Sequence, residues 1–551
     1  MKKDVTMKKN NFVKGAFITT LGIILTKILG IIYVIPFHAI IGEEGGALYG
    51  YAYTIYLFFI SISSAGIPLA ISKIVSEYQA LGYYKAKKRA FLLGKRLSLT
   101  LSFIIFLIIV LFAPILAKCI LGDIVGGNSL EDVTLVIRVI GTAILICPLL
   151  SIYRGYFEGH RFMSPPSISQ VLEQLIRVLI IIFGSLITLK VFKADIKIVV
   201  SVALLGATIG AFISYIYLFI KYLKNKSKFN DKVKNNIKEP RISNRNIVRK
   251  IIIYSIPFIM IDLFKSLYNY VDMFSVVKGL VNYAKFSAVD AETIYSMLST
   301  WSNKFNMIIL AISTGIIVSL IPDLTESLVK KDNEEINKKV GKSLSILLYF
   351  IVPMTLGICF LSKPIWTLFY GVSKYGPSVL SYYIFVGLII ALFTTVITIL
   401  QVLKDYKNVF LCLIVGVLVK LILNNSLLHS FNYFGFPPYY GFITATILGY
   451  LTSTIMCFVL LQVKFKVSFE SVLKHFIDIV SGAMLMLVCL ILIGFVIPTY
   501  SSTRIVNLVI ILFYALVGAV IYFVYAWKIN LTKSIFGNSF FRSLKRIILK
   551  K

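Results

Sequence analysis

The sequence has few of the residues that perform chemistry. Its 551 residues include four histidines, six cysteines and 24 acidic residues, against 57 lysines and arginines. The histidines are scattered, and no two cysteines have the spacing of a metal motif. The chain has no phosphate-binding loop and no HExxH pattern. We therefore predict no catalytic residue, no metal site and no cofactor, and we expect the protein not to be an enzyme.

The sequence also lacks polar stretches long enough for a soluble domain. Hydrophobic residues make up 58% of the chain, against about 45–50% in soluble domains. In lipid, only helices and closed barrels satisfy every backbone hydrogen bond. The apolar runs are about 20 residues long and do not alternate with polar residues, which excludes a barrel. The predicted fold is therefore an all-α polytopic membrane protein.

We count about fourteen transmembrane helices. The predicted spans are 13–41, 49–76, 90–118, 132–153, 165–189, 198–220, 251–277, 293–322, 343–362, 378–402, 408–428, 440–463, 476–497 and 505–527. The first apolar run is too long for a signal peptide, and no cleavage site follows it. We therefore expect a multi-pass protein of the cell membrane.

The net charge of +33 is concentrated in alternate loops. Most lysines and arginines lie in the N-terminal tail, the even-numbered loops and the C-terminal tail. By the positive-inside rule, this pattern predicts that both termini are cytoplasmic. Basic loops between apolar runs attract anionic lipid, so we expect membrane lipids, and not nucleic acid, as partners.

The longest polar segment lies between the sixth and seventh spans. Residues 221–250 carry eleven basic residues and two acids. We interpret this segment as a linker between two six-helix lobes, a spacing found in transporters with internal repeats. The predicted domains are an N-lobe at 1–223, a basic cytoplasmic linker at 224–250, a C-lobe at 251–464, two appended helices at 465–530 and a basic cytoplasmic tail at 531–551.

Cations inside membrane spans are costly and usually functional. Lys27 in the first span and Lys304 in the eighth have no acid within four residues on either side. They predict a positive cavity for an anionic substrate such as a phosphate or pyrophosphate. The alternative is that an acid on another helix neutralises them. Arg138, near the outer end of the fourth span, is a further candidate for substrate binding unless it only extends to the interface.

Two spans carry polar stripes that belong either to a structural seam between helices or to a coupling mechanism. Glu173 and Arg177 have the favourable i,i+4 order for an ion pair. In the seventh span, Asp262, Lys265 and Asp272 fall on one helical face together with Asn269.

For Lys420 in the eleventh span we consider two interpretations. Its side chain extends to the membrane interface, or it pairs with Asp262 and takes the place of a coupling sodium ion. We expect hinges where proline and glycine interrupt helices, at Pro36, Gly66 and Pro68.

Three segments resemble the SpoVB/YtgP-type polysaccharide biosynthesis family of the MOP flippase superfamily. The most specific segment is LLSIYRGYFEGHRFMSPPSISQVLEQLIRV at 149–178. SSAGIPLAISKIVSEY at 63–78 is similar to the second helix of that family, and TKILGIIYVIPF at 26–37 is similar to its first helix. The resemblance implies two six-helix lobes that open alternately, with two extra helices that help to form a groove for a lipid tail.

The resemblance also implies a cavity lined with basic residues. Lys27 and Lys304 fall where basic residues of the first and eighth helices are expected. The sequence departs from the pattern at Tyr33, where a second arginine would stand, and the second helix has no central basic residue.

The predicted function is a flippase that moves a polyprenyl-pyrophosphate-linked glycan precursor, lipid II above all, from the inner to the outer leaflet. One alternative is a MATE-like multidrug or cation antiporter, which would require an acid where the first span has Lys27. Another is a scaffold in an envelope-synthesis complex, whose proteins are possible partners. A membrane glycosyltransferase is disfavoured because the outer loops are short.

Overall fold

The protein is helical throughout the described part of the chain. The computed structural model describes residues 22, 25–225, 229, 240–330 and 332–537. Helices and their connecting loops account for these residues, and none of them lies in a strand. The all-α fold class is therefore confirmed. The chain divides into two compact units, Met1–Thr300 and Trp301–Lys551.

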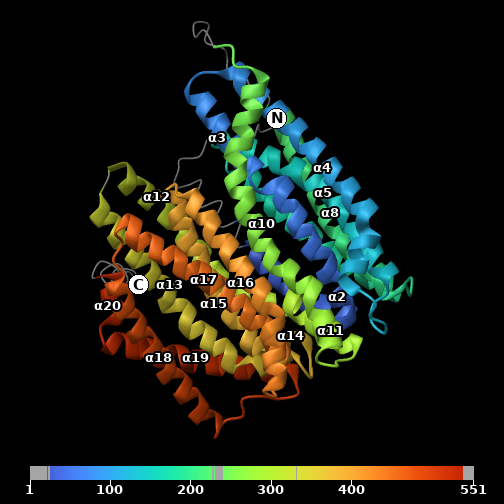
Figure 1. The fold of residues 1–551 in the computed structure, drawn as a ribbon, viewed down its shortest axis with the longest axis vertical. Coiled ribbons are helices and arrows are strands. Elements are labelled where there is room, and N and C mark those ends of the chain that lie inside the picture. Colours follow the sequence, from blue (N-terminus) through green and yellow to red (C-terminus); the bar gives the residue numbers. More distant parts are fainter. Residues whose placement is uncertain (1–21, 23–24, 226–228, 230–239, 331, 538–551) are drawn as a thin grey trace, which may run out of the picture. The chain divides into compact units, whose positions relative to one another are not determined.

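The first unit, blue to green in Figure 1, begins with a helical stretch at residues 25–32, which ends in a turn at Tyr33. Pro36 cannot donate a hydrogen bond to the carbonyl four residues earlier, so the helix is weakened here. The elements that follow are α2 (Val34–Ile60), the π-helix η1 (Ser61–Ala65), α3 (Ile67–Ala80), α4 (Tyr84–Leu121), α5 (Leu130–Gly159), α6 (Ser164–Leu179), η2 (Ile180–Gly184), α7 (Ser185–Lys190), α8 (Ile196–Lys224), α10 (Asn244–Asn282) and α11 (Ala288–Ser296).

The second unit, yellow to red in Figure 1, contains the remaining helices. They are α12 (Ser302–Lys330), α13 (Asn333–Phe360), α14 (Ser362–Tyr370), α15 (Gly376–Val402), α16 (Tyr406–Tyr433), α17 (Tyr439–Phe465), α18 (Glu470–Gly494), α19 (Arg504–Lys528) and α20 (Leu531–Phe536). The π-helix η3 (Met297–Trp301) leads into α12. Within this unit α16 packs on α17, and α13 packs on α18, which pairs with α19.

Twelve helices among the described residues are long and apolar enough to cross a membrane. Part of the predicted first span, 13–41, lies outside the described residues, and α10 is not among the twelve. A fourteen-helix count is therefore not confirmed. Several helices are longer than predicted; α5, for example, continues to Gly159 instead of ending at residue 153.

The predicted break in the second span is confirmed. Residues Ser61–Ala65 form a π-helix, the chain bends at Gly66, and α3 begins with Pro68 in its first turn. Proline is favoured there because its missing N–H would have no helical partner. A Cβ on Gly66 would collide with the backbone carbonyl of Ser255 in α10. The glycine therefore lets the start of α3 approach α10 closely. Whether the break acts as a hinge stays a prediction.

Contacts place α10 in the first unit, although it opens the predicted C-lobe. It packs against α2, α3 and α4, and the division of the chain falls after Thr300. The predicted linker at 224–250 lies mostly outside the described residues. The lobes at 1–223 and 251–464 therefore stay a prediction.

The α3–α5 interface depends on small residues. A Cβ on Gly155 would collide with the carbonyl oxygen of Pro68, and one on Gly159 would lie 2.8 Å from the carbonyl oxygen of Ser72. Backbone atoms cannot move aside as flexible side chains can, so these glycines determine how closely the two helices pack.

We expect Gly155→Ala to destabilise the protein by about 1–3 kcal/mol, the usual cost of overpacking a core. The measurement is the thermal unfolding temperature of the purified protein in detergent. Gly315→Ala in α12 is the control, because nothing lies within 4 Å of its added Cβ and alanine favours helix. Equal unfolding temperatures for Gly155→Ala and the wild type would contradict the close-packing argument.

Candidate functional site

A buried charge cluster joins α5 and α6 in the first unit. The two carboxylate oxygens of Glu173 accept separate hydrogen bonds, one from Arg154 Nη2 and one from Arg177 Nη2, each 2.8 Å long. The side chains of all three residues are about 85% buried. The predicted Glu173–Arg177 ion pair is thus present, and the cluster carries a net charge of +1.

Local structure positions the cluster. Ser169 Oγ accepts a 2.8 Å hydrogen bond from Arg154 Nε and donates to the carbonyl of Pro166 in the first turn of α6. Sequence reasoning missed Arg154, because the predicted fourth span ended one residue before it. The extended polar face of α6 was the signal that could have located this partner.

The helical stretch that carries Lys27 lies against α6. A Cβ on Gly22 would lie 3.2 Å from Ser167 Cβ, and one on Gly30 would lie 3.6 Å from Gln174 Nε2. The Lys27 side chain itself is half-buried. Lys27 therefore lies on a helix next to the one that carries Glu173 and Arg177.

An aromatic series replaces the arginine that the resemblance predicted at Tyr33. Tyr33 is buried, with its ring centroid 6.0 Å from that of Phe37, which in turn contacts Tyr49. Tyr49 stacks on Tyr53, and the Tyr56 hydroxyl lies 3.4 Å from Cys147 Sγ on α5. At position 33 an aromatic ring therefore takes the place of the expected cation. The ring of Tyr33 packs at the start of a series of aromatic rings along α2.

The predicted stripe on α10 is less buried than the cluster on α6. Lys265 Nζ lies 4.0 Å from Asp262 Oδ1, and these side chains are 33% and 50% exposed. Asp272, three turns further along, is half-buried. The Ser266 hydroxyl on the same helix lies 3.4 Å from that of Ser61 in η1. The stripe thus links an exposed face of α10 to the helix break near Gly66.

The other predicted cations lie in different surroundings. Arg138 is exposed, and its Nε donates a 3.4 Å hydrogen bond to the carbonyl of Val110. Lys304, near the start of α12 in the second unit, is half-buried. Since Lys27 belongs to the first unit, a cavity shared by Lys27 and Lys304 stays a prediction.

Lys420 is fully buried between α16 and α17. Its ammonium donates a hydrogen bond to the hydroxyl of Thr446, which donates to the carbonyl of Phe442. A side chain that reached the interface would retain some exposure, so burial disfavours that interpretation. The proposed partner Asp262 belongs to the other unit, and the pairing stays a prediction.

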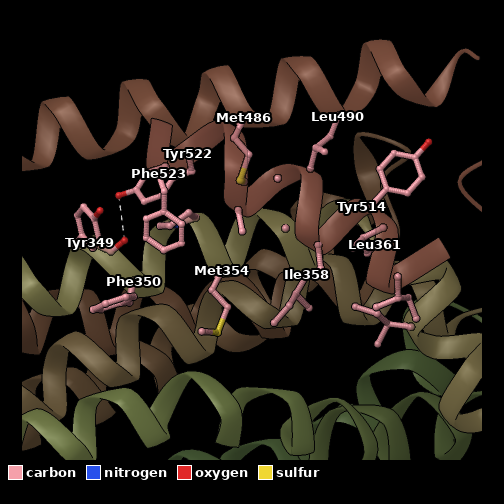
Figure 2. Close-up of a pocket in the computed structure, with 17 residues that line it drawn as sticks. Tyr349, Phe350, Met354, Ile358, Leu361, Met486, Leu490, Tyr514, Tyr522 and Phe523 are labelled. Atoms are coloured by element: carbon pink, nitrogen blue, oxygen red, sulfur yellow. Dashed lines mark hydrogen bonds between the residues drawn. The ribbon is translucent and has the colours of Figure 1, made fainter. Parts of the chain in front are cut away.

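An apolar groove lies between α13 and two later helices, α18 and α19 (Figure 2). Its volume is about 330 Å³. Apart from three tyrosines, every side chain that lines it is apolar: Phe350, Pro353, Met354, Gly357, Ile358, Leu361, Ile365, Met486, Leu490, Ile511, Ala515, Gly518, Ala519 and Phe523.

The three tyrosine hydroxyls of this groove are occupied elsewhere. Tyr522 donates to the carbonyl of Tyr349 over 3.0 Å, as Figure 2 shows, and Tyr514 donates to the carbonyl of Ile497 over 2.7 Å. The Tyr349 hydroxyl lies 3.0 Å from Thr532 Oγ1. The groove thus presents hydrocarbon to whatever enters it, and a polar ligand would lose its own hydrogen bonds there.

No group of three or more histidine, cysteine or acidic residues among the described residues could hold a metal ion.

These features define a polytopic membrane protein with paired charges in its helices and an apolar groove at its C-terminal end. Comparison with known proteins gives the family. The model for "Polysaccharide biosynthesis protein" matches residues 12–315. Two relatives come from Bacillus subtilis (strain 168). A lipid II flippase, MurJ, is 30% identical over 97% of this chain and 98% of its own, and stage V sporulation protein B is 30% identical over 42% of this chain and 43% of its own.

The chain therefore belongs to the polysaccharide biosynthesis protein family, and the resemblance noted in its sequence is confirmed. Solved structures show the same fold. A lipid II flippase MurJ in an inward closed conformation covers 93% of this chain and 98% of its own, with a TM-score of 0.67 at 15% identity. An inward-facing MATE transporter of the MOP superfamily covers 82% of this chain and 98% of its own, with a TM-score of 0.63 at 12% identity.

The relative that matches almost the whole chain is named as a flippase, in agreement with the prediction that this protein is not an enzyme. With its many apolar helices, the chain is a multi-pass protein of a bacterial membrane.

We expect Glu173→Gln to destabilise the protein by about 3–5 kcal/mol, because it leaves two buried guanidinium groups without their anion. The thermal unfolding temperature in detergent measures the loss. The matched control is Glu470→Gln, which removes an i,i+4 partner from Lys474 where both side chains are more than 70% exposed. Exposed pairs contribute little, so a similar effect of both changes would show that the cluster is not structural.

Proposed function

We propose that this protein is a flippase that moves a polyprenyl-pyrophosphate-linked glycan precursor, lipid II, from the inner to the outer leaflet by alternating access. The apolar groove between α13, α18 and α19 carries the proposal: its wall of hydrocarbon, with every tyrosine hydroxyl turned to another group, suits a polyprenyl tail. The near-full-length similarity to a lipid II flippase supports the substrate class.

The headgroup requires a separate, positive surface. Lys27 and Lys304 are both half-buried, each on a helix of a different unit. A pyrophosphate is bound well by lysine as a point charge, although lysine lacks the bidentate fork of arginine. In the proposed cycle the two lysines face one cavity that receives the pyrophosphate, while the tail stays in the groove.

Orientation and driving force follow from charge. Basic residues in alternate loops support a cytoplasmic position for both termini. An inside-negative membrane potential then favours export of a negative headgroup by about 2.3 kcal/mol per charge per 100 mV. Inward return of the emptied, positive cavity is favoured by the same field.

Two other functions receive less support. A MATE-like antiporter of cations requires an acid in the first-half cavity, whereas the first helix offers Lys27; the likeness to MATE structures, at 12% identity, concerns the fold alone. A scaffold in an envelope-synthesis complex has no need of half-buried lysines or of an apolar groove.

We expect Lys27→Ala and Lys304→Ala each to abolish exposure of lipid II on the outer leaflet of cells depleted of their own flippase. Each removes a cation that the pyrophosphate needs, whereas lysine-to-arginine changes retain activity. Lys330→Ala is the control: this lysine lies on the same helix as Lys304 but is 60% exposed, in a surface pair with Glu326. Full lipid II export by both alanine variants, at normal membrane levels, would refute the anionic cavity.

We expect Ala515→Phe to reduce lipid II export by at least about tenfold, because the phenyl ring occupies the groove that the tail needs. Ala515 is exposed and lines the groove, so the change should not disturb buried packing. Leu516→Phe is the matched control. Leu516 is the next residue along α19; its side chain is 66% exposed and does not line the groove. The same export assay applies, and undiminished export by Ala515→Phe would remove the groove from the substrate path.

A further inference from the structure

A second apolar groove lies within the first unit, between α4 and α10. Its volume is about 350 Å³, and Ile62 of η1 and Ile67 of α3 complete its lining. Apart from Thr100 and Ser255, every side chain that lines it is leucine or isoleucine. The Ser255 hydroxyl donates to the carbonyl of Ile251 over 2.8 Å, so it is occupied within its own helix. We call this site the α4–α10 groove.

The two long helices beside this groove run in the same direction. They pack against each other, and they have 38 and 39 residues. Near their far ends, Lys278 Nζ on α10 donates a 2.6 Å hydrogen bond to the carbonyl of Cys119 on α4. Since helices of equal length meet at their last turns, both also begin at the same end of the α4–α10 groove.

An arginine lies on each helix at that end of the groove. Arg96 is four residues before Thr100 on α4, and Arg249 is three and seven residues before Ile252 and Ile256 on α10. Residues at these spacings share one face of a helix. All five side chains are exposed, and the last three of the five line the groove. The two arginines therefore flank the mouth of the groove, one on each helix.

The neighbouring cations are occupied by other groups, whereas these two arginines are not. Lys250 Nζ lies 2.5 Å from Glu77 Oε1, and Lys95 Nζ lies 5.7 Å from the centre of the Tyr153 ring. Among the described residues, neither Arg96 nor Arg249 forms an ion pair. The mouth of the groove thus carries two positive charges that can bind an anion.

The polarity of the groove changes in order along its length. The arginines come first, the exposed hydroxyl of Thr100 is one turn further, and only hydrocarbon follows, at Ile104 and Ile259. A glycerophospholipid has the same order: a phosphate, then ester carbonyls, then acyl chains. Guanidinium groups bind phosphate oxygens as a fork, and a hydroxyl can donate to an ester carbonyl. A polyprenyl pyrophosphate has no ester carbonyl to place beside Thr100.

We propose that the α4–α10 groove binds one anionic glycerophospholipid, with an acyl chain between the two helices and its phosphate on Arg96 and Arg249. On the predicted topology both helices begin at the cytoplasmic side, where basic residues attract anionic lipid. Because the lipid contacts both helices, its binding stabilises their packing. The site is separate from the groove on α13, α18 and α19, and it does not depend on which substrate the protein transports.

The test titrates phosphatidylglycerol into the purified full-length protein in a neutral detergent. A ligand that binds only the folded protein raises its thermal unfolding temperature as the site fills, so the titration gives an apparent Kd. Phosphatidylcholine with the same acyl chains is the comparison, because its headgroup carries its own cation. We expect phosphatidylglycerol to bind about tenfold more tightly. Equal affinities for the two lipids would overturn the proposal.

We expect Arg96→Gln and Arg249→Gln each to weaken phosphatidylglycerol binding about five- to tenfold, because each removes a charged donor to the phosphate. Lys95→Gln is the matched control: this lysine is adjacent to Arg96 but its ammonium lies over Tyr153, so its removal should leave the affinity unchanged. Unchanged affinity in both arginine variants would refute the site, and so would an equal loss in Lys95→Gln.

The apolar part of the groove is tested without altering charge. Ile104→Trp should weaken phosphatidylglycerol binding about tenfold, because the larger ring fills the groove. Ile104 is 48% exposed, so the change spares buried packing; Phe103→Trp is the control, since Phe103 is 55% exposed and does not line the groove. Equal affinities of these two variants would remove the groove from the lipid site.

Competition with a polyprenyl phosphate separates this site from the transported lipid. We expect undecaprenyl phosphate to leave phosphatidylglycerol binding unchanged at equal concentration. Displacement of phosphatidylglycerol would assign the α4–α10 groove to the substrate and overturn the proposal. Binding is measured without transport, so full lipid II export by the Lys27 and Lys304 variants would refute the proposed function and leave this result standing.

Discussion

The pairing of Glu173 with two arginines is the interaction on which the first unit depends. Moving a single charge from water into an apolar bundle costs several kcal/mol, and that cost is offset only by an opposite charge in good geometry. Here one carboxylate, held between α5 and α6 at 2.8 Å from each guanidinium, satisfies two cations. Because the helix with Lys27 packs against α6, the cluster also determines the surroundings of the candidate substrate cation.

Another buried charge is held in a different way. Among the described residues, Glu292 accepts hydrogen bonds from the backbone amide and the side chain of Asn128 and from the Tyr51 hydroxyl. Neutral partners compensate a charge less completely than an ion does. A cluster such as Glu173 with its arginines therefore favours one arrangement, whereas a charge held by neutral groups is closer to balance between a buried and a hydrated state.

The sequence predicts features that depend on neighbours along one helix. Apolar run length predicted the helices, the i,i+4 spacing predicted the Glu173–Arg177 pair, and Gly66 with Pro68 predicted the break. Features that depend on other helices were missed. Arg154 joins the cluster because α5 continues six residues beyond the predicted end, and Glu292 was assigned to a loop because the predicted eighth span began one residue after it. Their partners, Ser169 and Asn128, lie on segments that only the fold brings close.

Tyr33 and the groove near α19 show how a glycan-lipid carrier separates two incompatible requirements. A pyrophosphate needs cations and water, whereas a polyprenyl chain needs their absence. The chain places its half-buried lysines on helices near the polar face of α6 or at the start of α12, and its apolar groove on α13, α18 and α19. Along α2, aromatic rings fill the position where the family resemblance predicts a further arginine. Fewer cations bind the anion less tightly, which favours release as much as capture, since a carrier that held its substrate strongly in both orientations would turn over slowly.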